Sequence, residues 1–311
     1  MRAVPHPIPY QGSKRLLAPL ILEHFPTQVD TLYEPFVGSA AISLAAAGRS
    51  LAATFRIGDS LAPLVDIWKR ILTDPETLAA DYACLWGAQQ ADPRAFYGEV
   101  RDAYNADGGA ARLLYLLARC VKNAVRFSNA GAFNQSPDNR RLGRTPARMR
   151  RALLAAHELL RGRAQAVPGD YADAIHDATP DDLVYMDPPY QGTSGGGDSR
   201  YHRSFDRPRF VRDLGTLLDR GVPFLISLDG RTGAKTYGPA LPAELGLTRV
   251  ELHAGRSSQA TLSGRRTETY ESLYMSPTLA TEGMSLRRSI HEAAPRLSGS
   301  RRRRRDMLPD V

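Results

Sequence analysis

The chain of 311 residues contains only two cysteines, and this scarcity excludes several kinds of chemistry. Cys84 and Cys120 have neither the spacing of metal ligands nor that of a redox pair, so both are expected to be small buried groups in a reducing compartment. A cysteine preceded by proline, which could attack a pyrimidine ring, is absent as well. We therefore expect neither a disulfide nor a metal site.

Long hydrophobic runs are also missing. No segment approaches the roughly 18 apolar residues that would span a membrane, and the N-terminus has no apolar signal segment. The composition, 42% hydrophobic and 24% charged, is typical of a globular protein, with enough residues for one large α/β domain with an insertion or for two modest domains. We expect a cytoplasmic protein with no membrane partner.

Acidic residues are scarce in the middle of the chain. Between Arg112 and Arg163 there are twelve Lys and Arg against Asp138 and Glu158, a local net charge of +10. The whole chain has a net charge of +8, so much of the remainder is acidic. One basic segment on an acidic scaffold is typical of a nucleic-acid face, and an ordinary solvated helical surface is the alternative.

The hydrophobic pattern predicts strands alternating with helices. The spacing of apolar residues predicts a helix over 16–25, a strand over 31–33, a helix over 40–47 and a strand over 51–58. This β-α-β pattern is typical of the nucleotide-binding half of a doubly wound sheet. Further strands are expected at 164–167, 183–186, 223–227, 247–252 and 272–275.

The stretch between these two groups of strands is helical and basic. Helices are expected over 113–125 and 146–160, with a loop rich in Asn and Gly over 126–144. We therefore predict a discontinuous sheet domain (1–70 and 165–279), a helical insertion (71–164) and a disordered basic tail (280–311). The run Arg301–Arg305 in that tail suits nonspecific DNA binding and a plain solvated terminus equally well.

Glycine is sparse where a phosphate-binding loop would need it. The turn from Glu34 to Ala40 contains only Gly38, so a pyrophosphate cradle is not indicated. The close approach that Gly38 allows, and the N–H groups of the next helix, suit a ligand with a carboxylate and a purine nucleoside but no phosphates. Asp59, after the next strand, can accept from ribose hydroxyls, cap the following helix, or do both.

The turn Tyr10-Gln-Gly-Ser-Lys14 precedes the first expected helix. Lysine in a first helical turn is disfavoured by the helix dipole unless an anion lies nearby. Lys14 can reach the carboxylate of such a ligand while Tyr10 packs on its adenosine side; a plain helix start capped by Ser13 is the alternative. Asp170, after the strand at 164–167, can accept from an adenine amino group.

The most informative motif is Asp187-Pro-Pro-Tyr190. It follows the expected strand 183–186, at the edge where open α/β sheets bind ligands. The prolines fix φ and remove two backbone donors, Asp187 supplies a carboxylate acceptor, and Tyr190 supplies a flat ring. These groups suit the exocyclic amine of a planar base, and a Pro-Pro turn with a surface Asp is the alternative.

The order Tyr-x-Gly-Ser-Lys, Glu-Pro-Phe-x-Gly-Ser, a basic helical insertion and Asp-Pro-Pro-Tyr resembles the class α adenine-N6 DNA methyltransferases, the D12 or DNA adenine methylase family. Segments 126–134 and 201–205 resemble the family too, so the likeness spans most of 8–276. It implies a Rossmann-like methyltransferase fold, S-adenosylmethionine as donor, duplex DNA as substrate and target recognition by the insertion. It also implies a bacterial or phage enzyme, monomeric or weakly dimeric, of a kind that accompanies restriction endonucleases.

The resemblance and the charge pattern together predict roles for individual residues. The donor is expected to contact Tyr10, Gly12, Lys14, Glu34, Phe36, Gly38, Asp59, Asp170 and Asp187. The catalytic pocket is expected to consist of Asp187, Pro188, Pro189 and Tyr190. DNA contacts are expected from Arg126, Asn134, Arg140, Arg141, Arg144, Tyr201 and Phe205.

The expected reaction is direct methyl transfer to N6 of an adenine flipped out of the duplex. Hydrogen bonds from the N6 protons to Asp187 and to the Pro188 carbonyl would expose the nitrogen lone pair, with Tyr190 stacked on the base. Two departures from the family pattern, Ser227-Leu-Asp-Gly and the glycine-rich stretch 191–200, concern the geometry of substrate loops. The alternatives are methylation of cytosine N4, of RNA or of a protein amide, and DNA binding without catalysis.

Overall fold

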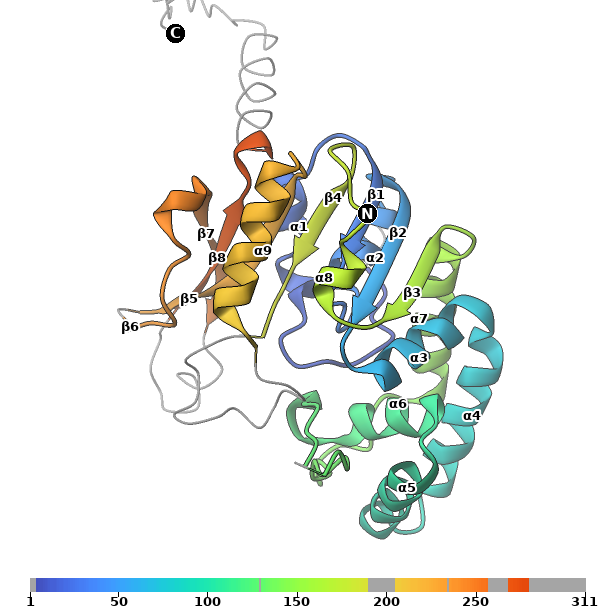
Figure 1. Ribbon diagram of the computed structural model, residues 1–311. Coiled ribbons are helices and arrows are strands. Elements are labelled where there is room, and N and C mark those ends of the chain that lie inside the picture. Colours follow the sequence, from blue (N-terminus) through green and yellow to red (C-terminus); the bar gives the residue numbers. More distant parts are fainter. Residues whose placement is uncertain (1–3, 129, 190–204, 234, 257–267, 280–311) are drawn as a thin grey trace, which may run out of the picture.

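The centre of the protein is one mixed β-sheet with helices on both faces (Figure 1). The structure, a computed structural model, describes residues 4–128, 130–189, 205–233, 235–256 and 268–279. The sheet order is β3-β2-β1-β4-β5-β8-β7, with β6 paired to β5. The strand bounds are β1 Val29–Glu34, β2 Ala52–Asp59, β3 Ala164–Pro168, β4 Leu183–Met186, β5 Phe224–Thr232, β6 Lys235–Thr236, β7 Thr248–Arg256 and β8 Glu268–Met275.

The strand order reverses at β1, which lies between β2 and β4. Strands β3, β2, β1, β4 and β5 are parallel, whereas β8 runs antiparallel to both β5 and β7. At such a reversal the connections leave neighbouring strands toward opposite faces, and a crevice opens at the carboxyl ends. The segments that follow Glu34 and Met186, the last residues of β1 and β4, therefore flank this crevice.

Central strands bury both of their faces. In β4, Leu183 and Tyr185 belong to the larger of two hydrophobic cores, and Val184 and Met186 belong to the smaller. Helices α2 (Ala41–Ala47) and α3 (Ala62–Thr73) pack in the larger core, and α8 (Tyr171–Ala174) and α9 (Arg207–Asp219) pack in the smaller one. A nearly continuous apolar strand is what a parallel sheet covered on both faces requires. The predicted Rossmann-like α/β fold is confirmed.

The helical insertion shares the larger core instead of forming its own. The helices are α1 Ala18–Ile21, α2 Ala41–Ala47, α3 Ala62–Thr73, α4 Pro75–Ala88, α5 Pro93–Asp107, α6 Ala110–Arg119, α7 Pro146–Leu160, α8 Tyr171–Ala174 and α9 Arg207–Asp219. Tyr82, Leu113 and Met149, from α4, α6 and α7, are buried in one cluster with Trp68 of α3. The predicted boundary at residue 71 falls inside α3. None of the described helices is long and apolar enough to cross a bilayer.

Two predicted helices were wrong in their extent. The segment 16–25 is broken into 3₁₀ turns at Lys14–Leu16 and Leu22–His24 around the short α1, where Pro19 leaves one backbone donor fewer. The helix predicted over 113–125 ends at Arg119. Beyond it, Lys122 and Asn123 adopt positive φ (59° and 52°), and the Asn123 side chain donates to the Leu117 carbonyl at 2.8 Å, so it satisfies the helix end.

Candidate active site

A cavity of about 320 Å³ opens at the carboxyl ends of β1, β2 and β4. Every residue predicted to contact the donor lines it, namely Tyr10, Gly12, Lys14, Glu34, Phe36, Gly38, Asp59, Asp170 and Asp187. Pro188, Pro189 and Phe205 line it as well. The structure thus brings together groups from six separate segments of the sequence. Tyr190 and Tyr201 lie outside the described residues.

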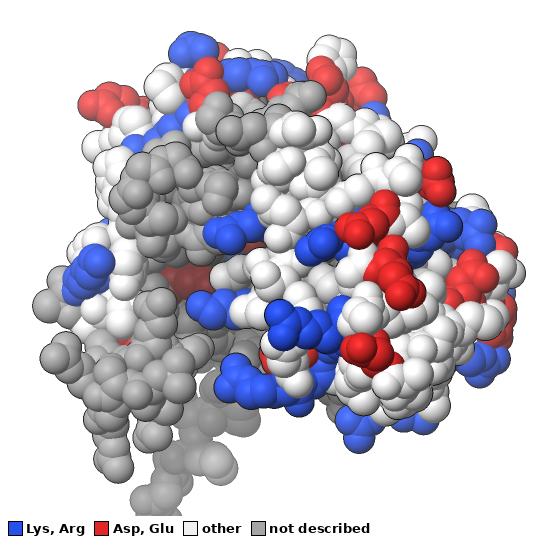
Figure 2. Space-filling view, turned by 90° about the horizontal axis from the view of Figure 1, so that it is seen from below, with Lys and Arg blue, Asp and Glu red and all other residues white. Residues whose placement is uncertain are grey.

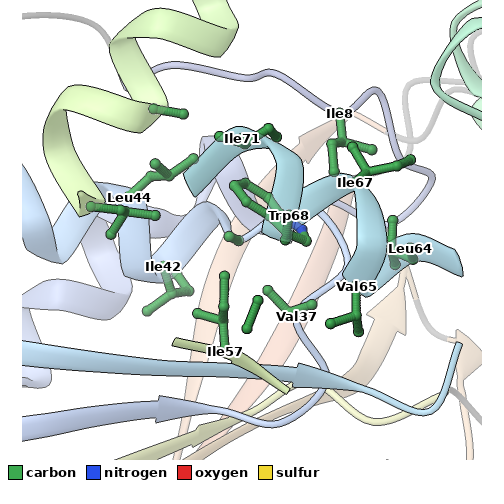
Figure 3. Packing of buried hydrophobic residues seen from close by; sticks show 14 of the residues in the cluster. Ile8, Val37, Ile42, Leu44, Ile57, Leu64, Val65, Ile67, Trp68 and Ile71 are labelled. Carbon is green, nitrogen blue, oxygen red and sulfur yellow. The ribbon is translucent and has the colours of Figure 1, made fainter. Parts of the chain in front are cut away.

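The turn after β1 is held in a conformation that requires glycine. Gly38 has φ +42°, and a Cβ there would lie 3.2 Å from the ring of Tyr10. The Val37 N–H donates to the Gly58 carbonyl at 2.7 Å, and the Trp68 indole donates to the Gly38 carbonyl at 3.1 Å. Figure 3 shows Trp68 packed near Val37 beneath this turn. The turn therefore forms a fixed wall of the cavity.

Replacing Gly38 by alanine is expected to weaken donor binding about tenfold, equivalent to about 1.4 kcal/mol. The added methyl group would displace the Tyr10 ring, and the left-handed backbone would be strained. Titration calorimetry with the donor measures the change. Gly98→Ala in α5 is the matched control, because its Cβ meets nothing within 4 Å and the substitution favours the helix. Equal donor affinity in the two variants would contradict the role of Gly38.

Glu34 is a buried carboxylate at the end of β1. Its Oε2 accepts from the Ser43 backbone N–H at 2.9 Å and from the Ser43 hydroxyl at 2.5 Å. Burial raises the pKa of Glu34 to about 7, although these hydrogen bonds oppose the shift. The side chain therefore changes charge within the physiological pH range.

Asp59 lines the cavity, and it does not cap α3, which begins at Ala62 without a side-chain cap. Its carboxylate accepts from the Leu61 N–H at 3.0 Å, so it orders the approach to α3, and from the Gly38 N–H at 3.3 Å. Burial raises the pKa of Asp59 to about 6, against the effect of these hydrogen bonds. The carboxylate still lines the cavity, so a structural role and ligand binding are compatible.

Lys14 is buried, and its partners belong to the protein. Its ammonium group lies 2.8 Å from Asp187 Oδ2 and 3.5 Å from Glu271 Oε2, and it donates to the Gly12 carbonyl at 3.3 Å. Burial lowers the pKa of Lys14, but the attraction of Asp187 and then of Glu271 outweighs it, so the net shift is upward. Ser13 makes no helix cap and instead hydrogen-bonds Ser39 at 2.7 Å. The alternative of a capped helix start was wrong.

Asp170 is held by an arginine that the sequence did not single out. Its two oxygens lie 2.8 and 3.0 Å from Arg209 of α9, and Oδ1 also accepts from the Ala172 N–H at 3.0 Å. The Arg209 guanidinium lies over the ring of Tyr171, 5.3 Å from its centroid. All of these side chains except Ala172 line the cavity. The pairing fixes the direction in which Asp170 presents its carboxylate.

Four aromatic rings pack together at the same end of the cavity. Phe36 stacks on Tyr171 with centroids 5.2 Å apart, and Phe205 lies 5.1 Å from Phe210 and 6.2 Å from Phe36. Phe205 was predicted to contact DNA. The structure places Phe205 in this cluster on the cavity wall, beside apolar neighbours on α8 and α9, and its contact with DNA stays a prediction.

The predicted DNA-contacting residues of the insertion lie between α6 and α7. Arg126 and Asn134 are exposed and adjacent, joined by the hydrogen bond from the Asn134 N–H to the Arg126 carbonyl (3.0 Å). Phe127 and Phe133 pack edge to face beneath them, and Asn105 of α5 exchanges two hydrogen bonds with the backbone of Phe133. This pair of segments, which we call the 126–134 hairpin, presents Arg126 and Asn134 from a fixed base.

Several arginines of the insertion contact other groups of the protein. Arg119 is buried and donates to the carbonyls of Asp138, Pro93 and Arg141. Arg144 is half-buried, and its guanidinium donates a hydrogen bond to the His6 carbonyl. A contact of Arg144 with DNA, as predicted, would have to share this guanidinium with the His6 carbonyl. Arg140 and Arg141 are exposed and both pair with Asp138. In Figure 2, several Lys and Arg side chains lie beside a hollow on the face viewed from below.

The fold and the cavity together define an α/β methyltransferase, and comparison with known proteins identifies its family. Residues 10–219 match the D12 class N6 adenine-specific DNA methyltransferases. The DNA N-6-adenine-methyltransferase of Escherichia phage P1 is 28% identical over 215 residues, which are 64% of this chain and 26% of the phage protein. Type II methyltransferase M1.LlaDCHI of Lactococcus lactis subsp. cremoris is 25% identical over 276 residues (83% of this chain, 92% of the relative). The Retron Ec67 DNA adenine methylase of Escherichia coli is 24% identical over 224 residues (70% and 75%).

The family match covers more than half of the chain, so this protein belongs to the D12 class of N6 adenine-specific DNA methyltransferases. The predicted family and the predicted adenine-specific DNA methylation are confirmed. The chain spans 26% of the length of the phage relative and most of the length of the other two. The individual site residues are not named by these comparisons.

Proposed function

We propose that the protein binds S-adenosylmethionine in the cavity and transfers its methyl group to N6 of an adenine flipped out of duplex DNA. Four carboxylates, those of Glu34, Asp59, Asp170 and Asp187, line the cavity, and Phe36 contributes an aromatic wall. This lining suits a purine nucleoside with cationic ammonium and sulfonium groups and does not suit phosphates. When bound, the sulfonium supplies an electrophilic methyl group.

The protein's part in the reaction centres on Asp187. Its carboxylate is anchored by Lys14 and lies at the cavity wall beside Pro188, and this is the observation that carries the proposal. Asp187 and the Pro188 carbonyl accept hydrogen bonds from the N6 protons, which localises the lone pair on N6. That lone pair forms the bond to the methyl carbon as the carbon–sulfur bond breaks toward sulfur, and N6 then loses one proton to solvent.

The other cavity residues hold the donor. We assign its ribose hydroxyls to Asp59 and its adenine amino group to Asp170, which Arg209 orients. The aromatic rings of Tyr10 and Phe36 would enclose the nucleoside. The predicted contact of Lys14 with the donor carboxylate becomes a secondary role, because its ammonium group already lies within 3.5 Å of two protein carboxylates.

For DNA recognition we assign the 126–134 hairpin together with Arg140 and Arg141. Exposed arginines next to the cavity would contact phosphates, and Asn134 offers an amide that can pair with a base edge. Extruding the target adenine costs a few kcal/mol, which contacts of this kind must offset.

Arg126→Gln is expected to weaken DNA binding at low salt about tenfold and to reduce the slope of log affinity against log salt by about 1, because one phosphate contact is lost. Fluorescence anisotropy with a labelled duplex at several salt concentrations measures both quantities. Arg212→Gln on α9 is the control, since it removes the same charge from an exposed site in the sheet domain. Identical salt slopes for the two variants would exclude the hairpin from the DNA interface.

Mass spectrometry of nucleosides from duplex DNA incubated with the protein and S-adenosylmethionine tests the proposal directly. The expected product is N6-methyladenine. N4-methylcytosine would overturn the assignment of the base while keeping the donor. Methylation of RNA in place of DNA would show that the basic surface serves to bind RNA. If neither nucleic acid is methylated, the proposed activity is refuted.

A further inference from the structure

Lys14 stands between two carboxylates that come from distant parts of the chain. Its ammonium group is 2.8 Å from Asp187, which follows β4, and 3.5 Å from Glu271 in β8. The Lys14 side chain is only 3% exposed, and both carboxylates are 21% exposed. The proposed reaction uses Asp187 and explains its pairing with Lys14. It gives no role to Glu271.

The position of Glu271 is fixed by the sheet. β8 is held between β5 and β7, and Glu271 is in register with Asp229 on one side and Leu252 on the other. The next residue, Ser272, is buried and accepts from Arg249 of β7 at 2.9 Å. Pairing along both edges of the strand fixes the backbone of Glu271, so its side chain starts from a fixed position within reach of Lys14.

The charges around Asp187 make a second carboxylate costly. Glu34 approaches it from β1, and the buried hydroxyl of Tyr185, which hydrogen-bonds Ser227 at 2.8 Å, approaches it from β4. With Lys14 from the N-terminal turn and Glu271 from β8, the described neighbours include one cation and several acidic groups. If the lysine served only to neutralise Asp187, a pair would suffice, and the second, partly buried carboxylate adds repulsion with Asp187 that the pair alone does not have.

We propose that Glu271 is a positioning residue that acts on Asp187 through Lys14. Because the ammonium is shared, Asp187 is held in place without being fully neutralised, and its carboxylate remains a strong acceptor for the adenine N6 protons. The trio of Lys14, Asp187 and Glu271 carries a net charge of −1 when all three are ionised. That charge stabilises the positive charge that develops on N6 during transfer. The proposal rests on the function proposed above.

Glu271→Gln, which keeps the shape of the side chain and removes its charge, is expected to lower kcat about 10- to 100-fold. KM for donor and for DNA should change by no more than about threefold, because Glu271 does not line the cavity. The acidic limb of kcat against pH should move to lower pH, since the loss of a neighbouring negative charge makes Asp187 easier to keep ionised. Glu271→Asp keeps the charge at a shorter reach and should recover part of kcat.

Glu251→Gln is the matched control. Glu251 lies on β7 opposite Ser272, next to Glu271, but it pairs with Arg231 and Arg249 away from Lys14. The Glu251→Gln variant should keep the wild-type kcat and the wild-type acidic limb of kcat against pH. A circular dichroism melt of each variant separates folding from catalysis, and Glu271→Asp serves as the test if Glu271→Gln melts near the assay temperature.

Three outcomes distinguish the possibilities. Wild-type protein that methylates adenine while Glu271→Gln retains its kcat and its acidic limb would overturn the role of Glu271 alone. A lower kcat with an unmoved limb, equally present in Glu251→Gln, would reduce Glu271 to support of the sheet and also overturn it. Wild-type protein with no methylation of adenine would refute the proposed function instead.

Discussion

Asp187→Ala is expected to lower the rate of methyl transfer at least a thousandfold while DNA affinity stays within about threefold. In the proposed mechanism the carboxylate accepts a hydrogen bond from one N6 proton and stabilises the positive charge that develops on that nitrogen, so its removal takes away interactions that strengthen in the transition state. DNA affinity is expected to persist because the exposed arginines of the insertion are untouched. Single-turnover methylation with labelled donor and anisotropy with duplex DNA measure the two quantities.

Asp187→Asn is the informative companion to this variant. It keeps a carbonyl acceptor but loses the ion pair with Lys14, 2.8 Å away. We expect a loss of rate intermediate between those of the wild type and the alanine variant. Both variants leave Lys14 with Glu271 as an ionic partner, so each melting temperature should be recorded. Substantial activity in Asp187→Ala would contradict the proposed mechanism.

The core of the site could be predicted from the sequence because its residues follow strands. Glu34 and Asp59 are the last residues of the parallel strands β1 and β2, and Asp170 and Asp187 come shortly after β3 and β4. The carboxyl ends of parallel strands meet at one edge of a sheet, so recognising the strands was enough to expect these side chains near one another. The contact between Lys14 and Asp187, 173 positions apart, does not follow from this geometry, because Lys14 lies in a 3₁₀ turn before β1.

The partners that orient these side chains could not be predicted in the same way. Glu271 and Arg209 lie on an antiparallel strand and a helix whose register against the site is set by packing, and no local motif marks either of them. For Arg119, the count of basic residues predicted too much. Arg119 contributes to the +10 of the insertion, yet it is buried and holds the loop before α7 through backbone carbonyls. Net charge gives the sign of a segment and does not separate exposed side chains from buried ones.

Helix ends were a further source of error, for a related reason. The apolar pattern continues past Arg119 as far as Val125, so periodicity alone extends α6 too far. The chain leaves the helix at Cys120, whose backbone is extended (φ −74°, ψ 160°). Beyond it, Lys122 and Asn123 have positive φ, and the Asn123 side chain donates to the Leu117 carbonyl in the last turn of α6. The Gln11 N–H donates to the Asn123 carbonyl at 3.0 Å, which joins the insertion to the N-terminal turn. Apolar periodicity carries no signal for these backbone conformations.

Glu34→Gln is expected to stabilise the unliganded protein at pH 8 and to leave its stability nearly unchanged at pH 5. Burial raises the pKa of Glu34 from 4.5 to about 7, so the folded protein keeps a proton there that the unfolded chain has already lost. The stability that this proton confers is present below about pH 4.5 and is lost as pH rises through about 7. The total is on the order of 3 kcal/mol. Glutamine carries no charge at either pH and can still accept from Ser43.

Thermal melts of the wild type and of Glu34→Gln across pH 5–8 measure this difference, with the exposed Glu23→Gln as control. A cationic donor favours the ionised carboxylate, so donor affinity of the wild type should rise between pH 6 and 8. The glutamine variant should bind more weakly and without that rise, because only an ionised group at this position gains from the positive charge of the ligand. A stability difference that is the same at pH 5 and pH 8 would show that Glu34 does not titrate in this range. In that case Glu34 is already ionised at pH 5, and its charge adds to those of Asp59, Asp170 and Asp187 in the cavity at neutral pH.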